Sequence, residues 1–164
     1  MTIYHLRREI DLGCALEEVF PFFSDARNLD ALTPPWLHFK ILSKHPIEMR
    51  VGACIQYQIR LHGIPVRWTS KITEWDPPQR FVDEQSSGPF RAWVHEHTFE
   101  KSEKGTLTRD HVQYGVYGGA LVDRLFVQRD LKKIFDYRQK RLQELWDRPQ
   151  PPDVHKNGRR DPCG

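Results

Sequence analysis

The last part of the chain before its polar tail has the clearest pattern of apolar and polar positions. Between Ala120 and Trp146 there is no proline or glycine, and apolar residues recur every three or four positions. This spacing predicts a long helix with one buried face. The apolar stripe consists of Leu121, Leu125, Leu131, Ile134, Phe135, Leu142, Leu145 and Trp146. Lysines and arginines fall mostly outside the stripe, so we expect a basic outer face.

Most of the preceding chain alternates between apolar and polar residues, which predicts strands. The alternating segments are 2–12, 39–42, 53–61, 64–75, 81–85, 90–101 and 106–114. Two short helices, 15–24 and 25–32, are expected after the first strand. Because consecutive strands are joined by short turns, the sheet should be antiparallel. We predict an α+β fold in which a curved sheet of about seven strands wraps the long C-terminal helix and leaves a cavity.

Composition narrows the class of protein. The chain has 164 residues, 38% of them hydrophobic and 29% charged, with a net charge of +3. We expect one folded domain over 1–146 and a disordered tail over 147–164, where proline and charged residues dominate. The charge is too small to indicate a nucleic-acid partner, and no apolar run is long enough for membrane insertion. Three widely spaced cysteines (Cys14, Cys54 and Cys163) favour a reducing, cytoplasmic location.

Several short motifs, taken in order, resemble a known superfamily. They include Thr33-Pro34-Pro35-Trp36, Trp75-Asp76-Pro77-Pro78 with Phe81-Val82-Asp83, Trp93-x-His95-x-His97-x-Phe99, Asp110 to Tyr114, and Phe135-x-Tyr137-Arg138. The order resembles the helix-grip (SRPBCC) superfamily of START lipid-transfer domains, birch-pollen-allergen-like proteins, polyketide cyclases and coenzyme-Q-binding proteins, especially its small bacterial stand-alone members. This resemblance implies a hydrophobic ligand cavity between sheet and helix. It implies no single activity, because the superfamily holds carriers, sensors and a few enzymes.

The penultimate predicted strand carries the candidate chemistry. His95 and His97 share a face, and a turn near 102–104 that pairs Phe99 with Thr106 would place His95 opposite Asp110. A histidine beside a carboxylate could act as a general base with its orienting partner. The same three residues could ligate a metal, or they could simply satisfy one another. A structural zinc usually takes four ligands and no cysteine is nearby, so we predict no metal and no cofactor.

Aromatic walls with a few polar groups are typical of a site for an apolar ligand. The residues expected to line it are Tyr57, Trp68, Gln85, Trp93, His95, His97, Asp110, Tyr114, Leu125 and Phe135. The first hypothesis is a non-enzymatic monomer or homodimer that binds a small hydrophobic molecule with a polar head group. The second is a cyclase- or hydratase-type enzyme that uses His95 and Asp110. The third is a protein-interaction module that uses the basic helix or the tail.

Overall fold

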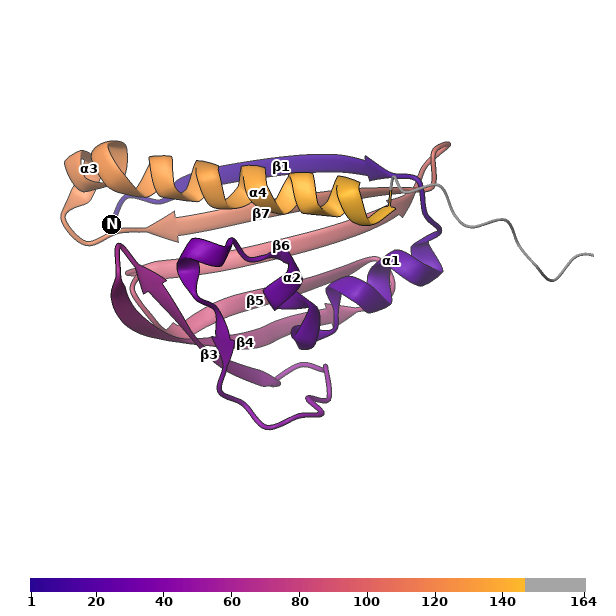
Figure 1. Ribbon diagram of the computed structural model, residues 1–164, viewed down its shortest axis with the longest axis horizontal. Coiled ribbons are helices and arrows are strands. Elements are labelled where there is room, and N and C mark those ends of the chain that lie inside the picture. The colour runs from indigo at the N-terminus through magenta and orange to yellow at the C-terminus, as the bar shows by residue number, and fades with distance from the viewer. Residues whose placement is uncertain (147–164) are drawn as a thin grey trace, which may run out of the picture.

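One seven-stranded antiparallel sheet contains most of the chain, in the order β1-β7-β6-β5-β4-β3-β2. The computed structural model describes residues 1–146, so the tail expected over 147–164 lies outside the described residues (Figure 1). The strands are β1 (Tyr4–Leu12), β2 (Lys40–Ile41), β3 (Cys54–Leu61), β4 (Ile64–Asp76), β5 (Arg80–Ser87), β6 (Ala92–Lys101) and β7 (Thr106–Gly115). The predicted fold class and number of strands are confirmed.

Short helices follow β1, and a long helical segment follows β7. The first group comprises α1 (Leu16–Phe23), a 3₁₀ turn (Ala26–Asn28), α2 (Leu29–Leu32) and a second 3₁₀ turn (Pro35–Leu37). The closing segment comprises α3 (Gly119–Val122), a π-helical turn (Asp123–Val127) and α4 (Gln128–Trp146). In Figure 1, α4 runs along β1 and β7, while α1 and α2 lie over the middle of the sheet.

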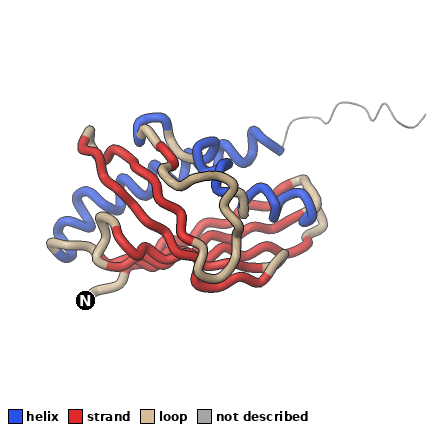
Figure 2. Tube along the Cα trace, turned by 90° about the horizontal axis from the view of Figure 1, so that it is seen from below, coloured by secondary structure: helices blue, strands red, loops and turns tan. Residues whose placement is uncertain are grey.

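The sheet curves around these helices. Figure 2, seen from below, shows the helices gathered on one side of the bent strands. In β4 the register to β5 shifts between Thr69 and Ser70 and again between Ile72 and Glu74. Such bulges bend a strand and increase its twist. They therefore help the sheet to curve around the space that lies between it and α4.

The start of the closing helix differs from the sequence prediction. Leu121 and Leu125 are exposed, at 69% and 49%, although the apolar stripe predicted both to be buried. The π-helical turn inserts an extra residue per turn and rotates the preceding residues away from the stripe of α4. Asp123 is buried there instead, and its carboxylate accepts a hydrogen bond from Gln128 Nε2 at 2.7 Å. From α4 onward the stripe is buried, at Leu131, Phe135 and Leu142.

The register of the β6–β7 hairpin also differs from the expected one. Lys101, not Phe99, pairs with Thr106, so His97 lies opposite Asp110 and His95 opposite Val112. The turn is tighter than expected because Ser102 Oγ accepts a hydrogen bond from the Gly105 amide at 3.1 Å. A Cβ at Gly105 would lie 2.5 Å from a backbone oxygen of β1, so the close approach requires glycine. The observed register differs from the predicted one by two residues. Because side chains alternate with a period of two, every side chain stays on its expected face.

Candidate ligand-binding site

Two adjoining cavities lie between the sheet and the helices. The smaller has a volume of about 130 Å³ and the larger about 210 Å³. The residues that line both are Leu29, Leu32, Tyr57, Trp68, Trp93, His95 and Arg138. Because these residues line both, the two cavities lie next to each other between the sheet and the helices.

The two cavities differ in chemistry. The larger is lined mainly by apolar side chains of α4 and β3, including Leu131, Phe135 and Ile59. The smaller has a polar floor, made by Ser70, Asp83, His95, His97 and Arg138. An apolar chamber that opens onto a few convergent polar groups is the usual form of a small-molecule site.

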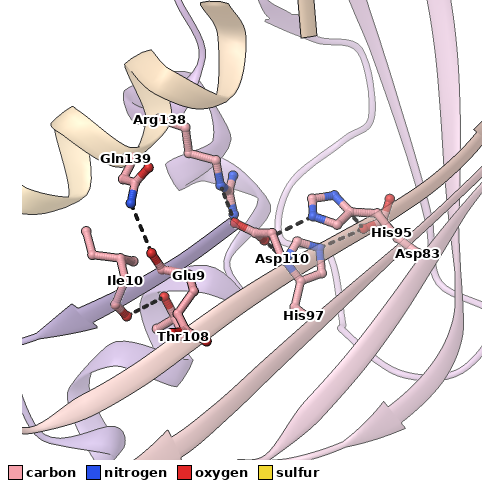
Figure 3. Close-up of polar contacts among 9 residues, drawn as sticks. All are labelled: Glu9, Ile10, Asp83, His95, His97, Thr108, Asp110, Arg138 and Gln139. Carbon is pink, nitrogen blue, oxygen red and sulfur yellow. Dashed lines mark hydrogen bonds and ion pairs between the residues drawn. The ribbon is translucent and has the colours of Figure 1, made fainter. Parts of the chain in front are cut away.

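Five polar side chains from four elements meet at and beneath this floor: Asp83, His95, His97, Asp110 and Arg138 (Figure 3). His95 Nε2 lies 3.0 Å from Asp110 Oδ1, and His97 Nε2 lies 2.9 Å from Asp83 Oδ2. His97 Nδ1 is also 3.0 Å from Asp110 Oδ1, although its angle is outside the hydrogen-bond range. Arg138 reaches down from α4 and places Nε 3.4 Å from Asp110 Oδ2. We call these five residues the histidine–aspartate cluster.

Aromatic rings fix the two imidazoles from both sides. The ring centroids of His95 and His97 are 3.8 Å apart. Phe81 stacks on His97 at 4.3 Å, and the edge of Phe135 meets His95 at 5.7 Å. Phe81 belongs to the apolar cluster around α1, and Phe135 to the cluster at the other end of the sheet. The histidines therefore bridge the two halves of the core.

The carboxylates of the cluster are ionised. Burial opposes charge on Asp110, but Arg138 and the hydrogen bonds from the two histidines outweigh it and hold the pKa of Asp110 well below its usual range. Burial likewise opposes charge on Asp83, and the hydrogen bond from His97 nevertheless keeps the pKa of Asp83 below its ordinary value. Two negative charges are thus buried beside the cavity.

The histidines differ in protonation. Burial lowers the pKa of His95, and the nearby charge of His97 lowers it further. Burial also works against a charge on His97, but its two carboxylate partners raise the pKa of His97 above the ordinary value. The cluster therefore favours a second proton on His97 and disfavours one on His95. Because Nε2 of His95 donates to Asp110, its Nδ1 carries a lone pair.

The structure brings together six of the ten expected ligand-binding residues. Tyr57, Trp68, Trp93, His95, His97 and Phe135 line one or both cavities. Asp110 lies beneath the histidines and holds them, rather than facing either of these two cavities. Tyr114 packs in the core against Phe90 and Trp93.

The other two expected residues lie away from the cavities. The Gln85 side chain instead exchanges hydrogen bonds with the backbone of Phe90, at 2.8 and 3.2 Å, and closes the β5–β6 connection. Leu125 is exposed because the π-helical turn rotates it outward. Neither residue contributes to the wall of the site.

Sequence reasoning missed Asp83 and Arg138. Asp83 shares a strand face with Gln85, which was expected to point inward, so alternation alone could have identified it. Arg138 lies three residues after Phe135 and therefore on the same helical face. From the sequence, Arg138 was named only within the motif Phe135-x-Tyr137-Arg138 and was given no role in the site.

Comparisons with known proteins place this chain in a family and its fold in a known class. Residues 12–142 match the family described as polyketide cyclase/dehydrase and lipid transport. The protein has the helix-grip architecture, and the chain belongs to this family. Family and fold together point to hydrophobic ligand binding or a polyketide-cyclase-type function. Comparison with functionally curated proteins finds no match. Within residues 1–146 no helix has the length and apolar character needed to cross a membrane.

Solved structures with the same fold support the assignment. The Zhui aromatase/cyclase from a Streptomyces species is 12% identical with a TM-score of 0.71, over 90% of this chain and 95% of that chain. Protein CV1439 from Chromobacterium violaceum is 19% identical with a TM-score of 0.70, over 90% and 99%. The ginseng major latex-like protein 151 from Panax ginseng is 10% identical with a TM-score of 0.62, over 88% and 97%. At these identities the similarity establishes the fold alone.

Proposed function

We propose that the protein binds a small amphiphilic molecule, with its apolar body in the larger cavity and its polar group at the histidine–aspartate cluster. The strongest support is that two residues of the cluster, His95 and Arg138, line both cavities. A ligand can thus bury its body against Phe135 and Ile59 and still reach the cluster. The role is that of a carrier or sensor.

Unpaired donors near the cavities favour a head group that accepts hydrogen bonds. Trp68 Nε1 is buried and has no hydrogen-bond partner among the described residues, and Arg138 Nε has only its 3.4 Å ion-pair contact with Asp110. Leaving such a buried group unpaired costs roughly 1–3 kcal/mol. A carbonyl or carboxylate oxygen of the ligand would relieve this cost. Burial of about 200 Å² of the ligand's apolar surface would add about 5 kcal/mol.

A second candidate function is proton abstraction, and the geometry of His95 favours it. The imidazole is neutral, its Nε2 is held by Asp110, and its Nδ1 has no hydrogen-bond partner among the described residues. Such a group can take a proton from the carbon between two carbonyls and leave an enolate, which Arg138 could stabilise. The third hypothesis named the basic helix or the tail: the helix is α4, and the tail lies outside the described residues.

His95→Asn separates the two candidate functions. With 1-anilinonaphthalene-8-sulfonate as the probe, the binding function predicts saturable one-site binding that the variant weakens by about tenfold or less, since one hydrogen bond is lost. In parallel, deuterium exchange at the central carbon of acetylacetone is followed by NMR. An enzyme would accelerate exchange and lose this with His95→Asn. Non-saturable probe binding to the wild-type protein would contradict the binding function.

A further inference from the structure

The cluster contains a set of ligand atoms suited to a metal. We propose that Asp83, His95 and His97 bind a divalent first-row cation of the Zn²⁺ or Fe²⁺ kind. Sequence reasoning had considered the two histidines with Asp110 and expected no metal. The structure instead offers Asp83 as the third ligand, because β5 pairs Asp83 directly with His95.

The distances fit three ligands on one face of a cation. The candidate ligand atoms of Asp83, His95 and His97 all lie within 4.8 Å of one another. Asp83 Oδ2 is 2.9 Å from His97 Nε2 and 3.9 Å from His95 Nδ1. Two ligand atoms that are each about 2.1 Å from a cation stand roughly 3.0–3.5 Å apart. The cation therefore requires only small side-chain adjustments.

Asp110 occupies the position of a supporting carboxylate. Its Oδ1 lies 3.0 Å from His95 Nε2 and 3.0 Å from His97 Nδ1, the ring nitrogens that the cation would not use. Metal-binding histidines almost always donate their other ring N–H to such a group, which fixes the ring and its tautomer. Asp110 is itself fixed by Arg138 through its second oxygen. One carboxylate thus contacts the outer nitrogen of both imidazoles, through a hydrogen bond to His95 and an ion-pair contact to His97.

The remaining coordination positions would face the cavity. Asp83, His95 and His97 all line the smaller cavity, which shares wall residues with the apolar one. Two carboxylates, Arg138 and a divalent cation sum to one positive charge, so an anionic oxygen ligand completes the balance. This point rests on the proposed function, because it identifies the head group as a carboxylate or enolate. A cation at this site would also occupy Nδ1 of His95, and His95 could then no longer act as a general base.

Titration of the EDTA-treated full chain with Co²⁺ tests the site. Visible d–d bands of cobalt intensify when the ion leaves octahedral water for a site of lower coordination number. We expect these bands to saturate at one equivalent, and Asp83→Asn or His97→Asn to abolish them. Asp110→Asn should weaken the affinity by about 10–100-fold, as for a residue that supports the ligands.

The matched control is His111→Asn. His111 forms another close histidine pair, with His5 on the opposite face of the sheet, at 3.0 Å. The variant His111→Asn should leave the cobalt bands unchanged. Absence of the bands in the wild-type chain, or their loss with His111→Asn alone, would overturn the proposal. Binding of 1-anilinonaphthalene-8-sulfonate to the EDTA-treated protein is measured separately, so that failure of the metal site is distinguished from failure of the ligand site.

Discussion

Replacing Arg138 by methionine is expected to lower the free energy of unfolding by about 3–5 kcal/mol, as for other buried ion pairs that lose one partner. Methionine keeps most of the side-chain volume but removes the charge that faces Asp110. The side chains of Arg138 and Asp110 are each only 11% exposed, so water cannot replace the lost partner. The variant also loses the contact of the guanidinium with the Phe23 ring, at 5.3 Å. Urea unfolding of metal-free protein, followed by circular dichroism, measures the change.

The double variant Arg138→Met with Asp110→Asn is the control for this prediction. It removes both members of the ion pair and leaves the hydrogen bond between His97 and Asp83 in place. We expect it to recover much of the lost stability, because no unpaired charge stays buried. Equal destabilisation of the single and double variants would show that Arg138 acts through packing alone. That result would contradict the electrostatic account of the cluster.

Filling the apolar cavity should abolish most ligand binding. Ile59 is 7% exposed and lines the larger cavity from β3, so Ile59→Trp places an indole where the ligand body would lie. A ligand that loses about 100 Å² of apolar contact loses about 2.5 kcal/mol, or nearly a hundredfold in Kd. Because the new side chain enters existing space, the fold should tolerate it. Fluorescence titration with 1-anilinonaphthalene-8-sulfonate measures the loss.

Ile64→Trp provides the matched control. Ile64 begins β4, is 66% exposed and belongs to neither cavity wall. The same substitution there should leave Kd unchanged, even though it adds an equal aromatic surface. The probe can also adhere to exposed apolar residues such as Phe126, which is 58% exposed. Unchanged affinity in Ile59→Trp would place the probe on such a surface and contradict the cavity site.

The fold could be predicted from sequence because its signals are periodic and repeated. The pattern of each of the seven alternating segments and of the amphipathic helix predicts one element by itself. An error in one element therefore does not change the predicted architecture. The motifs that resemble the helix-grip superfamily then placed the cavity between sheet and helix. The failures were local. The π-helical turn left Leu125 outside the cavity, and no periodic pattern encodes one inserted residue.

The site was harder to predict than the fold because it depends on register and on single polar residues. His95 and His97 were found because they alternate on one strand. Their main partners were assigned incompletely, since pairing depends on the turn that Ser102 and Gly105 form. Asp83 lies on a neighbouring strand, and only the β5–β6 register brings it to the histidines. A single sequence carries little information about such registers.

Native mass spectrometry of the freshly purified chain tests the central claim most directly. The account predicts one small amphiphile bound per chain, either carried through purification or taken up from a small-molecule extract of the expression host. Extraction after denaturation would then identify its apolar body and its hydrogen-bond-accepting head group. Ile59→Trp should remain at the mass of the free chain under the same conditions. A wild-type protein that stays at its free mass after exposure to the extract would contradict the account.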